Sequence, residues 1–214
     1  MPFLLTIRED FKNKSMLVIT GTGRSGTSAI AKWLDECGVL PYESEWIPRL
    51  NSGYEPKDVS RLNSAIWLGN DAPLQHLPTI EKMIKGFEYS VIKDHMFFYG
   101  KVLDTWLSIR QDLTFLICLR KFAHVESSRR KANQLNQIKT PEELNSCFGA
   151  FLSMLIFKGI KYEIVCYPNF IEEHKTVYNF INKLDSKILK NVSEPKSKKI
   201  WDSVMDINLS LTDF

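Results

Sequence analysis

The sequence predicts an α/β fold with a central parallel sheet, and two observations support this prediction. Short apolar runs alternate with longer segments of helical periodicity along the chain. The chain has 214 residues, of which 44% are hydrophobic and 25% charged, which is enough for one large domain with a substantial core. We therefore expect a single domain over residues 1–214, with a three-layer α/β/α arrangement.

Four short apolar runs are the strand candidates, because their length and composition are typical of buried strands. These runs are Met16–Thr20, Tyr89–Ile92, Thr114–Leu119 and Glu163–Cys166. Helical periodicity marks the segments that separate and follow them. The predicted helices are Thr27 to about Cys37, Asp58–Trp67, Thr79–Lys85, Gly100–Arg110, Ala123–Gln137, one that begins after Thr140, and a last clear one over Ile171–Leu184.

Turn and capping residues define several boundaries of these elements. Gly38 is a usual stop for the first helix. The sequence Thr-Pro-Glu-Glu at 140–143 is a capping box with proline at the first helical position. Residues 38–57 are rich in Pro, Gly, Asn and Ser, which predicts a long loop that could line a substrate site. The lysine-rich segment 196–199 is predicted to be disordered or solvated.

Charge and cysteine content narrow the class of partner. The formal net charge of +3 is too small to indicate nucleic acid and favours a local basic site for an anionic ligand. The four cysteines lie far apart with no C-x-x-C pair, which argues against a metal site or a disulfide framework. Cys118 and Cys166 fall inside apolar runs, so we expect reduced core thiols in a reducing compartment.

The apolar segments do not indicate a membrane protein. The longest candidate, Cys147–Ile160, is interrupted by Ser153 and Lys158 and predicts a buried helix. The N-terminal residues have only a short apolar patch followed by charges, which is unlike a secretory signal. We therefore expect a soluble, cytoplasmic protein without a transmembrane segment.

The first strand candidate runs directly into a glycine-rich loop. Gly21 and Gly26 keep the G-x-x-x-x-G spacing of a phosphate loop. Ser28 occupies the usual Ser/Thr position, but Thr27 stands where a P-loop has its lysine. Strand, loop and helix in this order bring backbone N–H groups and the positive end of a helix dipole together. The pattern predicts an anion site, to which Arg24 adds a forked, permanently charged donor.

The loop sequence RSGTS at residues 24–28 resembles, position by position, the 5′-phosphosulfate loop of sulfotransferases that use 3′-phosphoadenosine 5′-phosphosulfate (PAPS). The resemblance implies a P-loop NTPase-like sulfotransferase fold and a reaction that needs no metal, which accords with the missing lysine. In such an enzyme Arg24 would stabilise charge on the bridging oxygen as the S–O bond breaks. The resemblance assigns 5′-phosphosulfate binding to Gly23, Arg24, Ser25, Gly26, Thr27 and Ser28.

A second segment is similar to the same family. The strand candidate Thr114–Leu119 is followed by Arg120, and Ser128 lies eight positions later on the next predicted helix. In the family an arginine and a serine at this spacing grip the ribose 3′-phosphate, so the resemblance assigns this role to Arg120 and Ser128. A guanidinium and a hydroxyl can converge on one phosphate from a strand end and a helix start. Lys121 and Phe122 depart from the family pattern.

The strand candidate near residue 90 ends in a cluster of titratable groups. Lys93, Asp94 and His95 look like the K-T-H segment of cytosolic sulfotransferases, whose histidine is the catalytic base and whose lysine lies near the transferred group. Strand ends of this kind are the usual place for functional residues in α/β sheets. A histidine also suits base catalysis near neutral pH. His95 is therefore the favoured base, with Lys93 assisting and Asp94 as an alternative.

A competing base comes from the loop after the first helix. Residues 42–49 are similar to the E-E-x-x-I-I-P-R stretch of tyrosylprotein sulfotransferases, whose base is a glutamate. The alignment needs a short gap and therefore does not separate Glu43 from Glu45. A solvated loop carboxylate is the alternative interpretation of either residue.

Taken together, the motifs predict a sulfotransferase that moves a sulfuryl group from PAPS to a hydroxyl or amine acceptor by in-line displacement, leaving 3′,5′-bisphosphoadenosine (PAP). The expected partner is a small-molecule, sugar or peptide acceptor rather than nucleic acid, and a homodimer is left open. Ala29 stands where cytosolic members stack a tryptophan on adenine. The alternatives are a nucleotide kinase or NTPase with a degenerate P-loop, and a nucleotide-binding protein without turnover.

Overall fold

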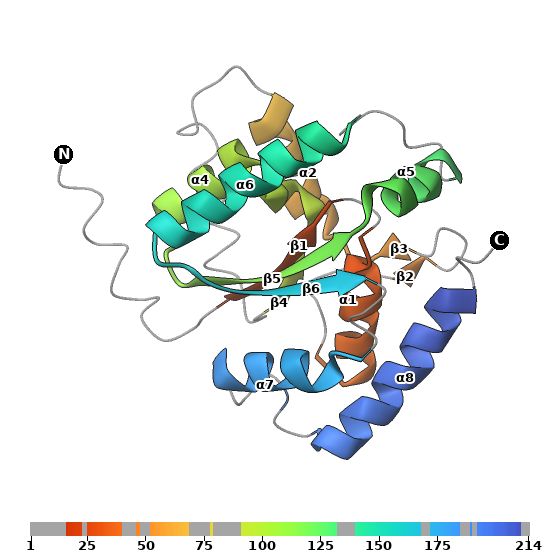
Figure 1. Ribbon diagram of the computed structural model, residues 1–214. Helices are drawn as coiled ribbons and strands as arrows, with labels where there is room; N and C mark the ends of the chain where they lie inside the picture. Colours follow the sequence, from red (N-terminus) through yellow and green to blue (C-terminus); the bar gives the residue numbers. More distant parts are fainter. Residues whose placement is uncertain are drawn as a thin grey trace.

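A computed structural model describes residues 16–22, 25–39, 46–47, 52–68, 78, 91–131, 140–167, 172–184, 189 and 192–210. The described part is an α/β fold in which helices cover both faces of a four-stranded parallel sheet (Figure 1). This confirms the predicted α/β class and is compatible with a three-layer arrangement. No helix among the described residues has the length and apolar content to cross a membrane.

The sheet brings three strand ends to one edge. Its strands are β1 (Met16–Gly21), β4 (Val91–Lys93), β5 (Leu113–Arg120) and β6 (Lys161–Tyr167), in the order β4-β1-β5-β6. All pairs are parallel, with β1 buried along its whole length between β4 and β5. The carboxyl ends of β4, β1 and β5 are therefore neighbours. In α/β sheets, ligands bind at such an edge.

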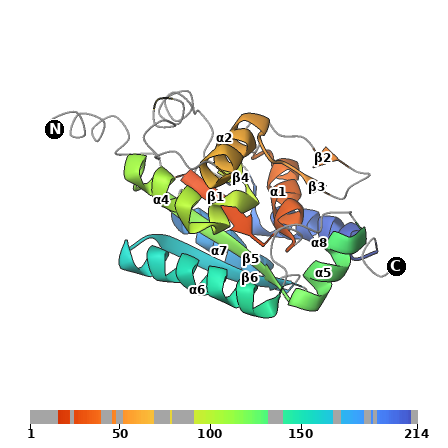
Figure 2. The same ribbon diagram turned by 90° about the horizontal axis from the view of Figure 1, so that it is seen from above.

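One face of the sheet is covered by α2 (Lys57–Leu68), the 3₁₀ helix η3 (His95–Phe98), α4 (Gly100–Ile109) and α6 (Pro141–Phe157). Figure 2 shows α2 on the β4 side of the sheet and α6 on the β6 side. Aromatic rings fill the space between these helices and the sheet. The ring of Phe97 lies 5.0 Å from that of Trp106 and 6.1 Å from that of Phe115. This packing fixes η3, which directly follows β4.

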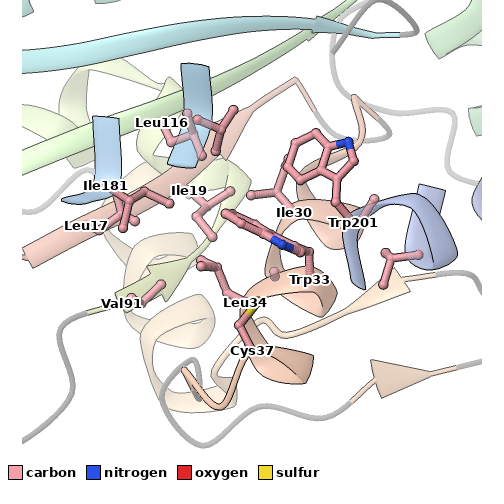
Figure 3. Packing of buried hydrophobic residues seen from close by; sticks show 14 of the residues in the cluster. Leu17, Ile19, Ile30, Trp33, Leu34, Cys37, Val91, Leu116, Ile181 and Trp201 are labelled. Carbon is pink, nitrogen blue, oxygen red and sulfur yellow. The ribbon is translucent and has the colours of Figure 1, made fainter. Parts of the chain in front are cut away.

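The other face is covered by α1 (Thr27–Glu36), α7 (His174–Leu184) and α8 (Glu194–Ser210). Figure 3 shows Trp33 of α1 packed beside Trp201 of α8, with ring centroids 5.0 Å apart. The indole N–H of Trp33 donates to the carbonyl of Ser197 at 3.2 Å, and Ser197 Oγ lies 2.9 Å from His174 Nε2. These fully buried contacts anchor the helix whose first turn follows the glycine loop.

The described part also contains a small strand pair and one further helix. β2 (Trp46–Ile47) and β3 (Ser52–Gly53) form an antiparallel pair, and α5 (Phe122–Lys131) directly follows β5. The pair β2–β3 lies inside the segment that we predicted to be a long loop, so part of that segment is strand. The predicted helix over 79–85 lies outside the described residues.

The described helices and strands agree with most predicted elements. The predicted capping box is confirmed, since the backbone N–H of Glu143 donates to Thr140 Oγ1 at 3.1 Å. Each of the four predicted sheet strands is present, and the described ends lie within two residues of the predicted ones. Two of the predicted helices are described in part, because residues 132–139 and 168–171 lie outside the described ranges.

The prediction for the lysine-rich segment was right that its lysines are solvated and wrong that the segment is disordered. Residues 196–199 lie in the first turns of α8 rather than in a disordered run. The lysines are exposed, and Lys198 forms an ion pair with Asp202 one turn later. Ser197, Trp201 and Val204 are buried on the opposite side of the helix, at the spacing of an amphipathic helix. The run of charge obscured this apolar spacing in the sequence.

Two predictions of burial were also wrong. The apolar segment over α6 is a helix, but Phe151 and Leu155 are its buried residues and Phe157 is 90% exposed. Cys166 is exposed at the end of the edge strand β6, whereas Cys118, which we also predicted to be a core thiol, is buried in β5. An apolar run therefore marked the element in each case without showing which side chains it buries.

The close approach of β1 and β5 predicts a strong effect of a side chain at Gly21. A Cβ added there would lie inside contact distance of the Cys118 carbonyl oxygen, a backbone atom, and 2.6 Å from Ser25 Oγ. We expect Gly21→Ala to lower the free energy of unfolding by about 1–3 kcal/mol, as overpacked interiors do. Urea denaturation measures this loss.

The matched control is Gly149→Ala, in the middle of α6, where an added Cβ meets no atom within 4 Å. Because alanine is the better helix former, this change should raise stability by up to about 1 kcal/mol. Equal effects of the two substitutions would contradict the proposed packing constraint at Gly21.

Candidate functional site

The glycine loop joins the end of β1 to the start of α1 at the centre of the sheet edge. Gly26 is the N-cap of α1 and has φ 99°, a left-handed conformation that glycine adopts without strain. Its carbonyl accepts hydrogen bonds from the backbone N–H groups of Ala29 and Ile30. The earlier N–H groups of a helix have no partner within the helix, and they form the positive end of its dipole. The strand and the helix that we predicted on either side of the loop are thus present.

Buried hydroxyls surround this loop. Thr20, Thr22 and Ser25 are buried, and among the described residues their hydroxyl oxygens have no hydrogen-bond partner. A buried polar group without a partner costs about 1–3 kcal/mol, and such groups often mark the place of an ion or ligand. A ligand with several acceptor oxygens would supply the missing partners. These hydroxyls therefore fit a phosphate or sulfate group at the loop.

Several predicted site residues lie outside the described residues. Gly23 and Arg24, in the middle of the loop, belong to this group, and so do the alternative bases Glu43 and Glu45. The roles that we predicted for these four residues stay predictions.

Arg120 lies on the neighbouring strand. It is the last residue of β5, which pairs with β1 so that Gly21 is opposite Cys118. β5 thus continues for two residues past the end of β1, and Arg120 pairs with Tyr167 of β6. Ser128 follows in α5, the helix after β5. The strand–helix context that we predicted for this pair is present.

On the other side of β1, Lys93 and His95 converge on a carboxylate that sequence reasoning missed. The ammonium group of Lys93 donates to Glu55 Oε1 at 2.7 Å. The ring nitrogen Nδ1 of His95 lies 3.1 Å from the same oxygen. The Lys93 side chain is almost fully buried, whereas those of His95 and Glu55 are partly exposed. The structure therefore brings two predicted site residues together through Glu55.

Asp94 has a different environment from its neighbours. It is fully buried and caps η3, because its Oδ1 accepts from the backbone N–H of Met96 at 2.8 Å. Its Oδ2 accepts from Asn63 Nδ2 at 2.9 Å, and Asn63 Oδ1 accepts from Trp106 Nε1 at 2.7 Å. Its backbone N–H donates to the carbonyl of Ile19 in β1. These contacts favour a structural role for Asp94 over that of a base.

A strained residue positions Glu55. Tyr54 has φ 62°, a left-handed conformation that side chains other than those of Gly, Asn and Asp rarely adopt. Its hydroxyl donates to Asp35 Oδ2 of α1 at 2.7 Å, and its ring is buried. Strain of this kind is often found at functional sites. The sequence around Glu55 gave no comparable signal, since it was one of several carboxylates in the predicted loop 38–57.

The charges in this cluster shift one another's pKa. Burial alone would raise the pKa of Glu55, but the hydrogen bond from His95 and the charge of Lys93 lower it to about 2. Burial alone would lower the pKa of His95, but the hydrogen bond to Glu55 and the charges of Glu55 and Asp94 raise it. Burial raises the pKa of Asp94. The cluster therefore favours an ionised Glu55 carboxylate paired with the Lys93 ammonium.

Glu55, Asp94 and His95 each offer a ligand atom within 4.8 Å of one another. However, the Lys93 ammonium already contacts Glu55 Oε1, and it would repel a cation bound there. Both carboxylate oxygens of Asp94 also accept hydrogen bonds. We therefore describe this group as an ion-pair cluster.

Comparison of the chain with protein-family models, with curated proteins and with solved structures gave no match.

The ion-pair cluster predicts a pH window for its contribution to stability. The folded-state pKa of Glu55 is lowered from 4.5, so its contribution is complete above pH 4.5 and is lost as the pH falls toward about 2. The pKa of His95 is raised from 6.5, so its contribution is complete below pH 6.5 and is lost as the pH rises through the higher folded-state value. The unfolding free energy lost in Glu55→Gln should be largest between these two pH values.

Urea denaturation of wild type and Glu55→Gln across this range measures the difference. Glu36→Gln is the control, because Glu36 is an exposed carboxylate that pairs with Lys32 one turn earlier in the same helix at 3.8 Å. Such pairs contribute about 0.5 kcal/mol or less. A stability difference between wild type and Glu55→Gln that is independent of pH would contradict the linkage.

Proposed function

We propose that this chain is a PAPS-dependent sulfotransferase. One observation carries the proposal: a glycine loop with buried hydroxyls that lack partners, Thr22 and Ser25 among them, precedes the first turn of α1. This loop lies between a strand that ends in Lys93 and one that ends in Arg120. An anion at the loop would thus have titratable groups on one side and a guanidinium on the other.

In this proposal the donor binds across the sheet edge. Gly23, Arg24, Ser25, Gly26, Thr27 and Ser28 hold the 5′-phosphosulfate. Arg120 and Ser128 hold the 3′-phosphate, which distinguishes this donor from ATP. The buried position of Ser25 and Thr27 and the glycine at the helix N-cap support the first assignment. The position of Arg120 at the end of the adjacent strand supports the second.

The proposed reaction is an in-line displacement at sulfur. The acceptor hydroxyl gives its proton to His95 while its oxygen forms a bond to sulfur, and the bond from sulfur to the 5′-phosphate oxygen breaks. PAP leaves with that electron pair. Arg24 and Lys93 offset the negative charge that develops on the bridging oxygen. Cytoplasmic location and a single domain over 1–214 remain parts of the same proposal.

His95 is the favoured base among the described carboxylates and histidines of the cluster. Glu55 is a weak proton acceptor, because its pKa is lowered to about 2. Asp94 is fully buried and already accepts hydrogen bonds at both oxygens. Glu43 and Glu45 remain alternatives from the loop. Of the remaining histidines, His174 is buried against Ser197 and His124 is exposed, in line with the absence of a motif around them.

The rival proposals are a nucleotide kinase or NTPase with a degenerate loop, and a nucleotide-binding protein without turnover. A kinase or NTPase needs a P-loop lysine to reach the β- and γ-phosphates, and this chain has Thr27 at that position. The second has no need of a buried lysine and histidine beside the loop. Lys93 and His95 therefore favour an enzyme over a binding protein.

Ligand-induced stabilisation separates these proposals. PAP should raise the midpoint of thermal unfolding without added metal, and more than ADP or Mg-ATP, because only PAP offers a 3′-phosphate. Arg120→Ala should weaken PAP binding by about 10-fold or more, as expected for the loss of a charge-assisted contact of ~1.5–3 kcal/mol. Arg61→Ala on α2, an exposed arginine, should leave PAP binding unchanged. Preference for Mg-ATP would refute the sulfotransferase proposal.

Turnover is measured with PAPS and a panel of phenols, steroids, sugars and tyrosyl peptides. With an acceptor from this panel that the enzyme sulfates, we expect kcat to fall by about 10²–10³ in Arg24→Ala. The negative charge that develops on the bridging oxygen then loses its stabilising guanidinium. His95→Ala should lower kcat by about 10²–10⁴ through loss of the base. Full activity of either variant would refute the corresponding role.

A further inference from the structure

We propose that Glu55 is a positioning residue of this site: its carboxylate holds the Nδ1–H of His95, so that Nε2 is the atom that receives the proton of the acceptor. The same carboxylate oxygen holds the ammonium group of Lys93 at the end of β4. This inference rests on the proposed function and adds to it a residue outside the family motifs that predicted the site.

The shared oxygen determines the tautomer of His95. Glu55 Oε1 lies 3.1 Å from His95 Nδ1 and accepts from Lys93 Nζ at 2.7 Å. An ionised carboxylate only accepts hydrogen bonds, so the hydrogen of a neutral His95 must be on Nδ1. The lone pair of neutral His95 is then on Nε2. A base held in this way presents a single atom to the acceptor hydroxyl.

The backbone before Glu55 fixes its place relative to the glycine loop. Tyr54 keeps its left-handed conformation, and its buried hydroxyl donates to Asp35 near the end of α1. α1 is also the helix whose N-terminus follows the loop, and Trp33 anchors it against α8. The phosphate side of the site and the Glu55 carboxylate are thus attached to one rigid helix. A charged partner placed by a strained and anchored residue is a feature of preorganised sites.

Glu55 also sets the charge around the base. Among the described residues, the charged groups near His95 include Glu55, Asp94 at 3.6 Å from Nδ1, and the ammonium of Lys93. When His95 accepts a proton it becomes a cation, and the carboxylate of Glu55 stabilises that cation. The hydrogen bond and the charge of Glu55 both raise the pKa of His95. Loss of the Glu55 charge should therefore lower that pKa and weaken the base.

The test uses Glu55→Gln and Glu55→Asp in the full chain, with Glu36→Gln as the control. Nitrogen-15 NMR of His95 should show the Nδ1–H tautomer in wild type, and a lower histidine pKa in Glu55→Gln. With PAPS and an acceptor that the enzyme sulfates, kcat should fall by about 10- to 100-fold in Glu55→Gln at a pH above the acidic limb, where His95 is neutral in both proteins. The dissociation constant of PAP should change by less than about threefold, because Glu55 does not touch the phosphate groups in this account.

The pH profile supplies a readout that a purely structural role would not change. Activity requires neutral His95, so kcat falls on the acidic side of its pKa. In Glu55→Gln this acidic limb should move to lower pH. Glu55→Asp keeps the carboxylate charge, so its limb should lie between those of wild type and Glu55→Gln. Glu55→Asp also covers the case in which Glu55→Gln does not fold.

Two results would overturn the inference while leaving the proposed function intact. One is that the wild type is active and Glu55→Gln has the same kcat and pH profile as the wild type. The other is a His95 pKa and tautomer that do not change in Glu55→Gln. Failure of the proposed function appears separately, as wild type that neither binds PAP nor turns over PAPS, and that result would remove the catalytic role of Glu55 as well.

Discussion

The pairing of β1 with a parallel strand on each side is the constraint on which the rest of the structure depends. The register places Ile19 opposite Lys93 on one side and Gly21 opposite Cys118 on the other. Because the strands are parallel, their carboxyl ends meet at one edge, and the absence of a side chain at Gly21 lets the Cys118 carbonyl and the Ser25 hydroxyl approach its backbone closely. The site therefore needs no contribution from the far end of the sheet.

The polar groups on the two sides of the candidate site differ in whether they have partners within the protein. On the loop side, the hydroxyls of Thr22 and Ser25 have no hydrogen-bond partner among the described residues. This is expected of a site where a bound ligand supplies the missing partners. On the β4 side, Lys93 and His95 both already contact the carboxylate of Glu55. We infer that the donor completes the first side, while the second is preorganised before any ligand binds.

The sequence predicted the fold class and the strand ends because both depend on local patterns. Apolar runs and the capping box at Thr140 identified elements that the structure contains. Glu55 was missed because its importance arises from the left-handed backbone at Tyr54 and from contacts across about 40 residues of sequence, which no local pattern encodes. The helix α8 was missed because its lysines made the segment look uniformly polar. Its apolar residues are recognised as one face of a helix only from the structure, in which Trp201 packs against Trp33.

The central claim is that this edge binds a nucleotide through both a 5′-anion and a 3′-phosphate. Calorimetric titration of the wild-type chain with PAP and with AMP, in the absence of divalent metal, tests it most directly, because the two ligands differ only by the 3′-phosphate. If Arg120 grips the 3′-phosphate, PAP should bind at least about 10-fold more tightly than AMP, a difference of ~1.4 kcal/mol. Equal affinity for the two nucleotides, or no binding of either, would contradict it.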